Sequence, residues 1–194
     1  SSDVVLSISS ADAGEATVTS SLTFTSGNWD TPQTVTVTGA DDDLIDGTQT
    51  TTITVSVNDG SSDNDFDGVS DQTVSVATTD DDVAGFTIAE TGGSTSVAES
   101  GNTDTFTVAL DAQPDSDVVI QFVSADTGEA TVTSLLTFTS ANWDTPQTVT
   151  VTGVDENFVD LDQTTEITAS VLEVSSDDNF DSVSDQTVSV TTTD

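Results

Sequence analysis

The sequence predicts an all-β protein, and two features of the chain lead to this prediction. Short runs alternate apolar or β-branched residues with polar ones, as in residues 33–38, 52–57 and 105–110. A side-chain period of two is typical of strands with one buried face. Clusters of Asp, Gly, Ser and Asn separate these runs and are typical of turns. The chain is therefore expected to consist of many short strands joined by turns.

The charge of the chain is entirely of one sign. Its 194 residues include 36 Asp and Glu and no Lys, Arg or His, for a formal charge of −36 at pH 7. Self-repulsion on this scale destabilises a compact state, so we expect cations or a basic partner to offset it. Nucleic acid is excluded as a partner, because phosphate contacts need Lys and Arg. Disorder is disfavoured, because hydrophobic residues make up 33% of the chain and follow the strand period.

Composition also bears on location. No apolar run approaches the length of a membrane span, so we expect no membrane insertion. The chain has no Cys and hence no disulfide framework, which leaves metal ions as the expected staples of an extracellular protein. A cytosolic protein without basic residues would be unusual, so we expect an extracellular or cell-surface location. No signal peptide is visible, and the chain has the character of an internal fragment.

A long internal repeat sets the domain plan. The segment from Asn28 to Gly39 recurs from Asn142 to Gly153, an offset of 142 − 28 = 114 residues. Residues 1–80 align with residues 115–194 without a gap, and by direct count 56 of those 80 positions are identical. One such period has the size of a small β-sandwich domain. The sequence therefore predicts tandem immunoglobulin-like antiparallel β-sandwich domains of about seven strands each.

The first copy is expected to be incomplete. Three expected strands have no counterpart before Ser1: residues 84–90, 94–99 and 104–110. We therefore expect residues 1–80 to be a β-sandwich repeat that lacks its first strands, residues 81–83 to be an acidic linker, and residues 84–194 to be a complete repeat. The missing strands are expected either to have been cut away or to come from another chain.

Strand order predicts where the carboxylates gather. Five further strands are expected at residues 117–124, 135–140, 147–153, 164–172 and 186–192. In an antiparallel sandwich, every second connection lies at the same tip. One tip of the complete copy then collects Glu99, Asp126, Glu129, Asp155, Glu156 and Asp160, with the terminal Asp194. The first copy has a similar set at Asp12, Glu15, Asp41, Asp42, Asp43 and Asp46, and the acidic linker adds Asp80, Asp81 and Asp82.

Calcium is the expected ligand of these clusters. Oxygen ligands without His or Cys suit hard cations, and Ca²⁺ accepts about 6–8 of them in loose geometry. Magnesium keeps more of its waters and uses fewer carboxylates. If repeats stack head to tail, bound calcium is expected to stiffen the acidic junction between them. The alternative is a solvated acidic surface that keeps the protein soluble.

A second motif predicts calcium at the opposite tip. Residues 63–68 match the opening of a calcium loop, with Asp63, Asp65 and Asp67 as ligands. The Glu expected at the twelfth loop position is absent, since Val74 stands there. The second copy, residues 177–182, also loses the Gly, so the pattern is weaker there.

Three short motifs follow one another along the second copy: Ser96-Val97-Ala98-Glu99-Ser100-Gly101, then Leu136-Thr137-Phe138, then an acidic loop and a terminal Asp. Together they resemble the Calx-beta-like or cadherin-like tandem repeats of giant bacterial surface proteins (adhesins). The resemblance implies a β-sandwich that binds calcium at one tip through Glu99, Asp126, Asp155, Glu156 and Asp160, with Asp80, Asp81 and Asp82 serving the first copy. The sequence departs from that family in its acidic loop, which mixes Asp with Asn and has Leu161 where the first copy has Gly47.

The expected function is that of an extracellular structural repeat, a calcium-stabilised spacer or filament segment of a large surface protein. The alternative is an adhesin module that itself binds a glycan, surface or protein, with Trp143 as a contact point. Neighbouring repeats, stacked head to tail, are the expected partners, and strand exchange between copies would make a homopolymer. An enzyme is not expected, because triad chemistry usually needs a His or Lys base and the chain has neither.

Overall fold

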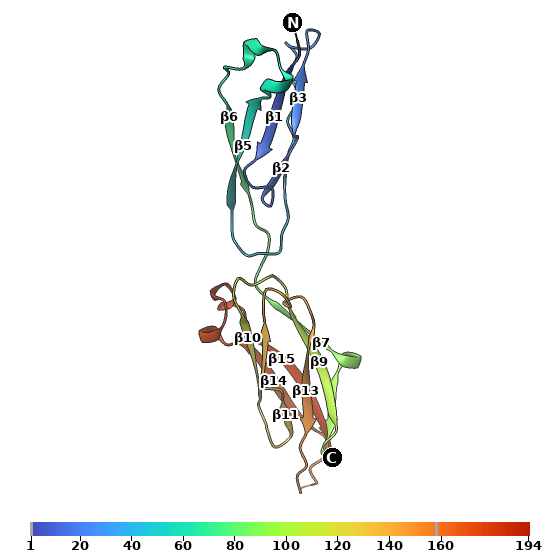
Figure 1. Ribbon diagram of the computed structural model, residues 1–194. Helices are drawn as coiled ribbons and strands as arrows, with labels where there is room; N and C mark the ends of the chain where they lie inside the picture. Colours follow the sequence, from blue (N-terminus) through green and yellow to red (C-terminus); the bar gives the residue numbers. More distant parts are fainter. Residues whose placement is uncertain (1, 158) are drawn as a thin grey trace. The chain divides into compact units, whose positions relative to one another are not determined.

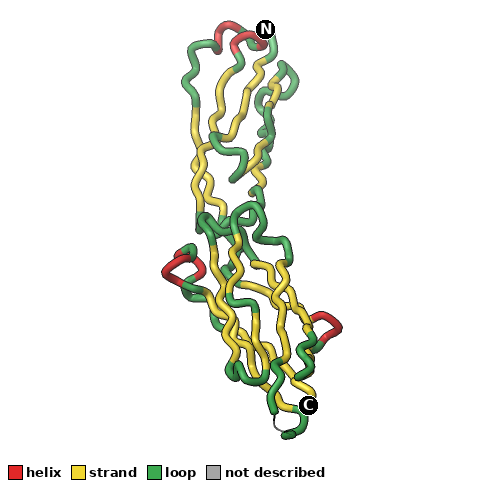
Figure 2. Tube along the Cα trace, turned by 60° about the horizontal axis from the view of Figure 1, so that its bottom comes forward, coloured by secondary structure: helices red, strands yellow, loops and turns green. Residues whose placement is uncertain are grey.

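The computed structural model describes residues 2–157 and 159–194. The chain divides into two compact units (Figure 1). The first comprises Ser1–Asp42 with Asp46–Asp81, and the second comprises Asp82–Asp194 with Asp43–Ile45. Both are all-β, as predicted, and Figure 2 shows helix only as short turns between strands. The 3₁₀ helices of the described residues have three residues each, and none has the length or hydropathy of a membrane-crossing helix.

The second unit is built of two sheets. The larger sheet has the order β12 (Leu135–Phe138), β10 (Val118–Ser124), β14 (Gln163–Val171), β15 (Gln186–Thr193) and β8 (Thr95–Ala98). The smaller sheet has the order β11 (Ala130–Val132), β13 (Gln147–Gly153), β9 (Thr103–Leu110) and β7 (Phe86–Glu90). From β7 to β14, consecutive strands alternate between the two sheets, and β15 then pairs with β14 in the larger sheet.

The first strand of the second unit is split between the two sheets. β7 pairs with β9 in antiparallel orientation, whereas β8 pairs with β15 in parallel. The chain crosses from one sheet to the other in the 3₁₀ turn η3 (Thr91–Gly93), where Gly92 and Gly93 have φ of 75° and 84°. Glycine adopts these angles readily because it has no Cβ. Every other pairing between strands of the described residues is antiparallel, as predicted.

The core of the second unit includes the inner face of β9. Phe106 and Val108 are fully buried and Leu110 is nearly so, which confirms the period-two alternation predicted for this strand. The Phe106 ring meets the Phe122 ring of β10 edge to face, with ring centroids 5.8 Å apart. Fully burying a side chain of this kind contributes about 1.5–3 kcal/mol. β9 is therefore held by packing as well as by its hydrogen bonds to β13.

The first unit contains counterparts of six of these strands. One sheet has the order β3 (Ser21–Phe24), β1 (Val4–Ser10), β5 (Gln49–Val57) and β6 (Gln72–Thr78), and a second sheet pairs β2 (Ala16–Val18) with β4 (Val37–Gly39). Among the described residues of this unit, there is no counterpart of β7, β8 or β9. Both the face and the edges that those strands would cover are therefore open in the first unit.

β4 shows what a missing strand does to its neighbour. In the second unit, β13 pairs with β9 from Gln147 to Thr152. In the first unit, the same sequence is strand only at Val37–Gly39, where β2 pairs with it. The alternation at residues 33–38 predicts a longer strand, and the prediction is wrong for residues 33–36. Among the residues that the structure describes, no strand lies on the β9 side of the first unit to satisfy their backbone groups.

The strands predicted for the second copy match the observed bounds to within two residues. β11 (Ala130–Val132) and its counterpart β2 (Ala16–Val18) are not predicted from the sequence. A three-residue strand is too short to display a period, so alternation alone does not reveal it.

Candidate metal centre

Carboxylates from four separate segments meet at one tip of the second unit. Glu99 follows β8, Glu129 precedes β11, Glu156 and Asp160 lie between β13 and β14, and Asp194 follows β15. Carboxylate oxygens of Glu99, Glu156 and Asp160 all lie within 4.8 Å of one another. Glu129 and Asp194 are close enough to act electrostatically on Glu99. We call these five residues the tip cluster.

Backbone hydrogen bonds position the segments that carry the tip cluster. The Glu99 N–H donates to the Thr193 carbonyl at 3.1 Å, which extends the parallel pairing of β8 with β15. The Val154 N–H donates to the Glu129 carbonyl at 2.9 Å, which fixes Glu129 against the end of β13. The carboxylates are therefore brought together by the sheet framework and not by attraction between side chains.

A tight turn presents Glu99 to the cluster. Gly101, with φ of 82°, donates its N–H to the Ala98 carbonyl at 3.0 Å, and the Asn102 side chain accepts from the Ala98 N–H. Gly153 lies directly against this turn, since an added Cβ would overlap the Ala98 carbonyl oxygen and lie 2.8 Å from its carbon. The roles of Asn102 and Gly153 are not predicted from the sequence. The available signal for Gly153 is that this glycine recurs in both copies.

The electrostatics of the tip cluster oppose ionisation. Burial raises the pKa of Glu99, Glu129 and Glu156 above the ordinary value of 4.5, and neighbouring carboxylates raise it further. Asp160 is a neighbour that acts on all three, and it also hydrogen-bonds Glu156. Like charges this close cannot all ionise without a compensating cation.

Two oxygens of the tip cluster are buried without a partner. Glu129 Oε2 and Glu156 Oε1 are shielded from solvent, and no hydrogen-bond donor among the described residues reaches either. A buried polar group left unpaired costs about 1–3 kcal/mol, and more when it is charged. The sequence contains no Lys, Arg or His side chain that could supply a positive donor. Positive charge for these oxygens would therefore have to come from outside the chain.

Calcium fits this donor set. All the side-chain donors of the cluster are carboxylate oxygens, which hard cations prefer. Calcium tolerates irregular geometry and mono- or bidentate carboxylates, so ligands on several loops suit it. Glu99, Glu156 and Asp160 have oxygens close enough together to hold it, and Glu129 and Asp194 lie near enough to act on Glu99 electrostatically.

Two further predicted ligands flank the tip cluster. Asp126 contributes to the raised pKa of Glu129, and Asp155 contributes to that of Glu99. Both side chains are exposed. Asp126 Oδ1 accepts the Gly128 N–H at 2.9 Å, so one of its oxygens also closes the turn before β11.

The first unit holds a smaller version of the cluster. Burial, and then Asp46, Asp42 and Asp12, raise the pKa of Glu15, so these four carboxylates are neighbours. Glu99 has no counterpart in this group, because the 114-residue offset between the copies would place it at 99 − 114 = −15, before Ser1. The counterparts of Glu15, Asp46, Asp42 and Asp12 in the second unit are Glu129, Asp160, Glu156 and Asp126.

The other ligands predicted for the first copy and the linker are Asp41, Asp43, Asp80, Asp81 and Asp82. Asp80 Oδ2 accepts a backbone N–H of the β4–β5 connection at 2.7 Å. Asp41 and Asp81 line an open hollow of the first unit, whereas Asp43 and Asp82 belong to the second unit. None of these five contributes to the raised pKa of Glu15.

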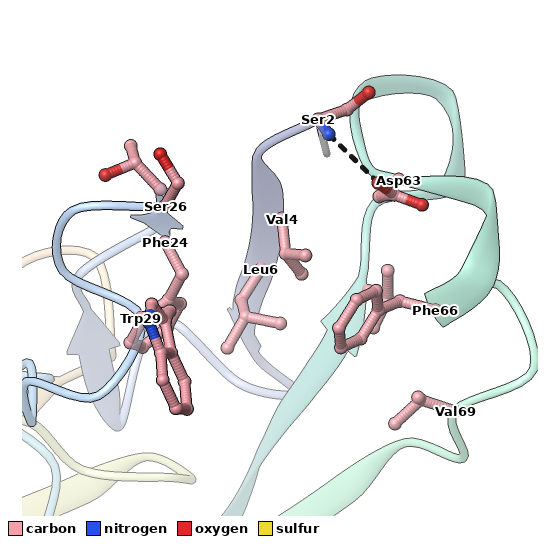
Figure 3. A pocket seen from close by; sticks show the side chains of 11 residues that line it. Ser2, Val4, Leu6, Phe24, Ser26, Trp29, Asp63, Phe66 and Val69 are labelled. Carbon is pink, nitrogen blue, oxygen red and sulfur yellow. Dashed lines mark hydrogen bonds between the residues drawn. The ribbon is translucent and has the colours of Figure 1, made fainter.

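The predicted calcium loop at residues 63–68 contains a 3₁₀ turn capped by its first Asp. The Asp63 carboxylate accepts the Ser2 N–H at 2.9 Å (Figure 3) and the Asp65 N–H at 3.2 Å, at the start of η2 (Asn64–Phe66). These hydrogen bonds, the one from Ser2 first, lower the pKa of Asp63. Asp65 and Asp67 are exposed. Asp177 makes the same pair of bonds in the second unit, so this Asp has a capping role in both copies. Calcium binding by the loop stays a prediction.

Comparison with known proteins gives similarity of structure only. No protein-family model matches this chain, and no curated protein matches it in sequence. Domains 4 and 5 of the S-layer protein SbsC are 21% identical to it over 97% of this chain and 70% of that one, with a TM-score of 0.45. Domains 4–9 of SbsC are 21% identical over 96% of this chain, which spans 21% of that structure, with a TM-score of 0.44. CBD12 from CALX1.2 is 14% identical over 88% of this chain and 67% of that one, with a TM-score of 0.35. Values of this size do not assign a function.

Proposed function

We propose that this chain is an extracellular structural repeat, a calcium-stabilised spacer or filament segment of a larger surface protein. The observation that supports it most directly is the pair of buried, unpartnered oxygens on Glu129 and Glu156. Burying carboxylates is unfavourable unless they are paired or bind a metal, and the chain has no basic side chain to pair them.

The tip cluster is arranged to join segments of both sheets. Glu99 and Asp194 extend from β8 and β15 of the larger sheet, and Glu129 leads into β11 of the smaller one. Glu156 and Asp160 lie on the connection that crosses from β13 to β14, between the sheets. When bound, calcium supplies the positive charge that removes the repulsion between these carboxylates. The carboxylates of the tip cluster then connect the two sheets at this end of the second unit.

An extracellular setting accords with such a site. Extracellular calcium-binding modules work with dissociation constants of about 10⁻⁴–10⁻³ M. A repeat that is stiff only with calcium bound is suited to a spacer, because its length and rigidity are then set outside the cell.

No observation favours an adhesive or catalytic role over this one. Trp143, the suggested contact for a glycan, packs against the core of the second unit. The chain has no His, Lys or Cys to act as base or nucleophile. We therefore propose no enzymatic activity.

The adhesin alternative can be tested separately. If the protein is an adhesin that uses this residue, Trp143→Ala would abolish attachment while the second unit stays folded.

Thermal unfolding at fixed ionic strength tests the proposal. We expect calcium to raise the unfolding midpoint of residues 1–194 more than magnesium does, because a ligand that binds only the folded state stabilises it by mass action. Glu99→Gln should remove most of the calcium-specific rise, because it replaces an ionised ligand with a neutral one of the same shape.

The matched control is Glu173→Gln. Glu173 is exposed in η4 (Glu173–Ser175), which follows the far end of β14, and it carries the same charge change. That variant should keep the full response to calcium. Equal midpoints in calcium, magnesium and added sodium chloride would mean general charge screening and would refute the proposed site.

A further inference from the structure

The first unit has an open apolar groove on the inner face of its larger sheet. The groove has a volume of about 560 Å³. Figure 3 shows Val4 and Leu6 of β1 between Phe24 and Trp29 on one side and Phe66 and Val69 on the other. Trp29 is 72% exposed and Phe66 is 44% exposed. Two open aromatic rings beside a groove of this size indicate a surface that is normally covered.

The second unit shows what covers this surface in a complete sandwich. Phe138 and Phe180, the counterparts of the two groove phenylalanines, are fully buried. Both belong to one hydrophobic cluster with Phe106, Val108 and Leu110 of β9. The residues that leave the groove open in the first unit are thus the ones that β9 helps to bury in the second.

A second hollow marks the position of another absent strand. It has a volume of about 460 Å³ and runs along residues 76–79, at the edge formed by β6. In the second unit the matching residues 190–193 pair with β8. Gly39 lies on the other wall of the hollow, and its counterpart Gly153 touches the backbone of β8. The groove and the hollow therefore coincide with the places of two different strands, one in each sheet.

We propose that the groove and the hollow together bind an additional strand segment of the same repeat type, a polypeptide with the alternation of residues 84–110. The match is specific, because 56 of 80 aligned positions are identical between the two units and the second unit holds this segment in the equivalent place. Within the described residues there is one such segment and two faces that accept it. Moving it from the second unit to the first would expose as much apolar surface as it covers, so the occupant is an extra copy of the segment.

The experiment adds that segment to the full chain. A peptide of residues 83–114 contains no Trp, so in a Trp143→Phe background the fluorescence of Trp29 reports only on the groove. We expect peptide binding to shift Trp29 emission to shorter wavelength and to reduce its quenching by acrylamide. A control peptide with Phe106→Asp and Val108→Asp keeps the length but places charges on the inward face, and it should have no effect.

A fusion protein provides a second measurement, in which the segment is covalently attached and both Trp residues are kept. Residues 83–114 are placed directly before Ser1, so that Pro114 precedes Ser1 as it precedes Asp115 in the second unit. We expect the unfolding midpoint of the first unit to rise by more than about 10 °C, because several large apolar side chains become buried.

Three outcomes would overturn the inference. Unchanged exposure of Trp29 in the fused chain would show that the segment does not occupy the groove. An equal response to both peptides would show non-specific adsorption. Concentration-dependent association of residues 1–194 alone, with Trp29 already shielded, would show that a second chain gives up the segment of its own second unit, and would refute the inference that the occupant is an extra segment.

Discussion

The two units contain six corresponding strands of closely similar sequence, yet only the second has a closed core. Phe180 is fully buried where Phe66 is 44% exposed, and Val188 is 3% exposed where Val74 is 56% exposed. The difference arises from three strands, β7, β8 and β9, that only the second unit contains among the described residues. Burial at these positions is therefore decided by strands that lie at least 180 − 110 = 70 residues earlier in the chain, and not by the local residues.

The largest effect is expected from the same glycine substitution in both units. Gly153→Ala should destabilise the second unit by about 3 kcal/mol, because the new Cβ would overlap the Ala98 backbone and overpacking against backbone cannot relax easily. Gly39→Ala should change stability by only about 0.5 kcal/mol or less, since its Cβ would meet Thr78 Cγ2 at an ordinary 3.5 Å. Urea denaturation of each variant measures the two values. Equal losses would mean that β8 does not account for the difference.

The calcium response should also differ between the units. Glu129→Gln and Glu15→Gln change counterpart residues, but only the cluster around Glu129 includes a Glu99. Calcium at a hundred times its dissociation constant stabilises a folded state by about 2.7 kcal/mol. We expect Glu129→Gln to lose most of that stabilisation and Glu15→Gln to lose much less. Calorimetric titration of the two variants checks this, and a larger loss at Glu15 would reverse the order of the two sites.

The pH dependence without calcium should be stronger for the second unit. The folded-state pKa values of Glu99, Glu129 and Glu156 lie above the unfolded value of 4.5, so the folded state binds protons more tightly. Stability is therefore greatest below pH 4.5 and falls as pH rises through the raised values. The first unit has one such group, Glu15, and should show a shallower fall. Midpoints measured in chelator from pH 4 upward give both slopes.

Calcium should reverse that trend, because its ligands must be deprotonated. Replacing all three glutamates of the second unit by Gln should flatten its slope in chelator. A slope that persists in the triple variant would assign the pH dependence to the overall charge of −36 and not to the tip cluster.

The smallest effect is expected where the two copies differ at one backbone position. Leu161 has φ of 70° and Gly47 has φ of 71°, and each donates its N–H to an Asp at the end of the last strand. A non-glycine residue in this left-handed region costs about 1 kcal/mol. Leu161→Gly should therefore stabilise the second unit by up to about 1 kcal/mol, since the 74% exposed side chain loses little packing. Gly47→Leu should destabilise the first unit by a similar amount, and unfolding midpoints of the swapped pair measure both.

The longer strands of the second copy and the gathering of carboxylates could be predicted from the sequence, because both depend on local period and strand order. Glu99, Glu129 and Asp160 lie far apart in the chain, and counting strands was enough to place them at one tip. The split first strand could not be predicted to pair in parallel with β15, since alternation carries no information about partner or direction. The same limit applies to Asn102, whose role depends on the turn it closes.

The loop at residues 63–68 shows a different limit. Its Asp spacing matches a calcium loop, but the same residues suit a helix cap, and the Asp63 carboxylate accepts two backbone N–H groups. Sequence spacing does not distinguish an oxygen that awaits a cation from one that caps a turn. Phe66 also indicates a structural role for this loop, because its counterpart Phe180 is a core residue of the second unit.

The open edge of β6 has a practical consequence for handling pieces of such a protein. Residues Gln72–Thr78 form a strand without a single charged side chain, and in the first unit no β8 covers it. An uncharged, Val- and Thr-rich edge can template association with another edge, and the repulsion of a strongly acidic chain is what opposes this. Calcium or high salt would weaken that repulsion, so we expect a piece with such an open edge to aggregate under the conditions that, on our proposal, stabilise a complete repeat. Recombinant pieces are best begun near Val83, where a full set of strands follows.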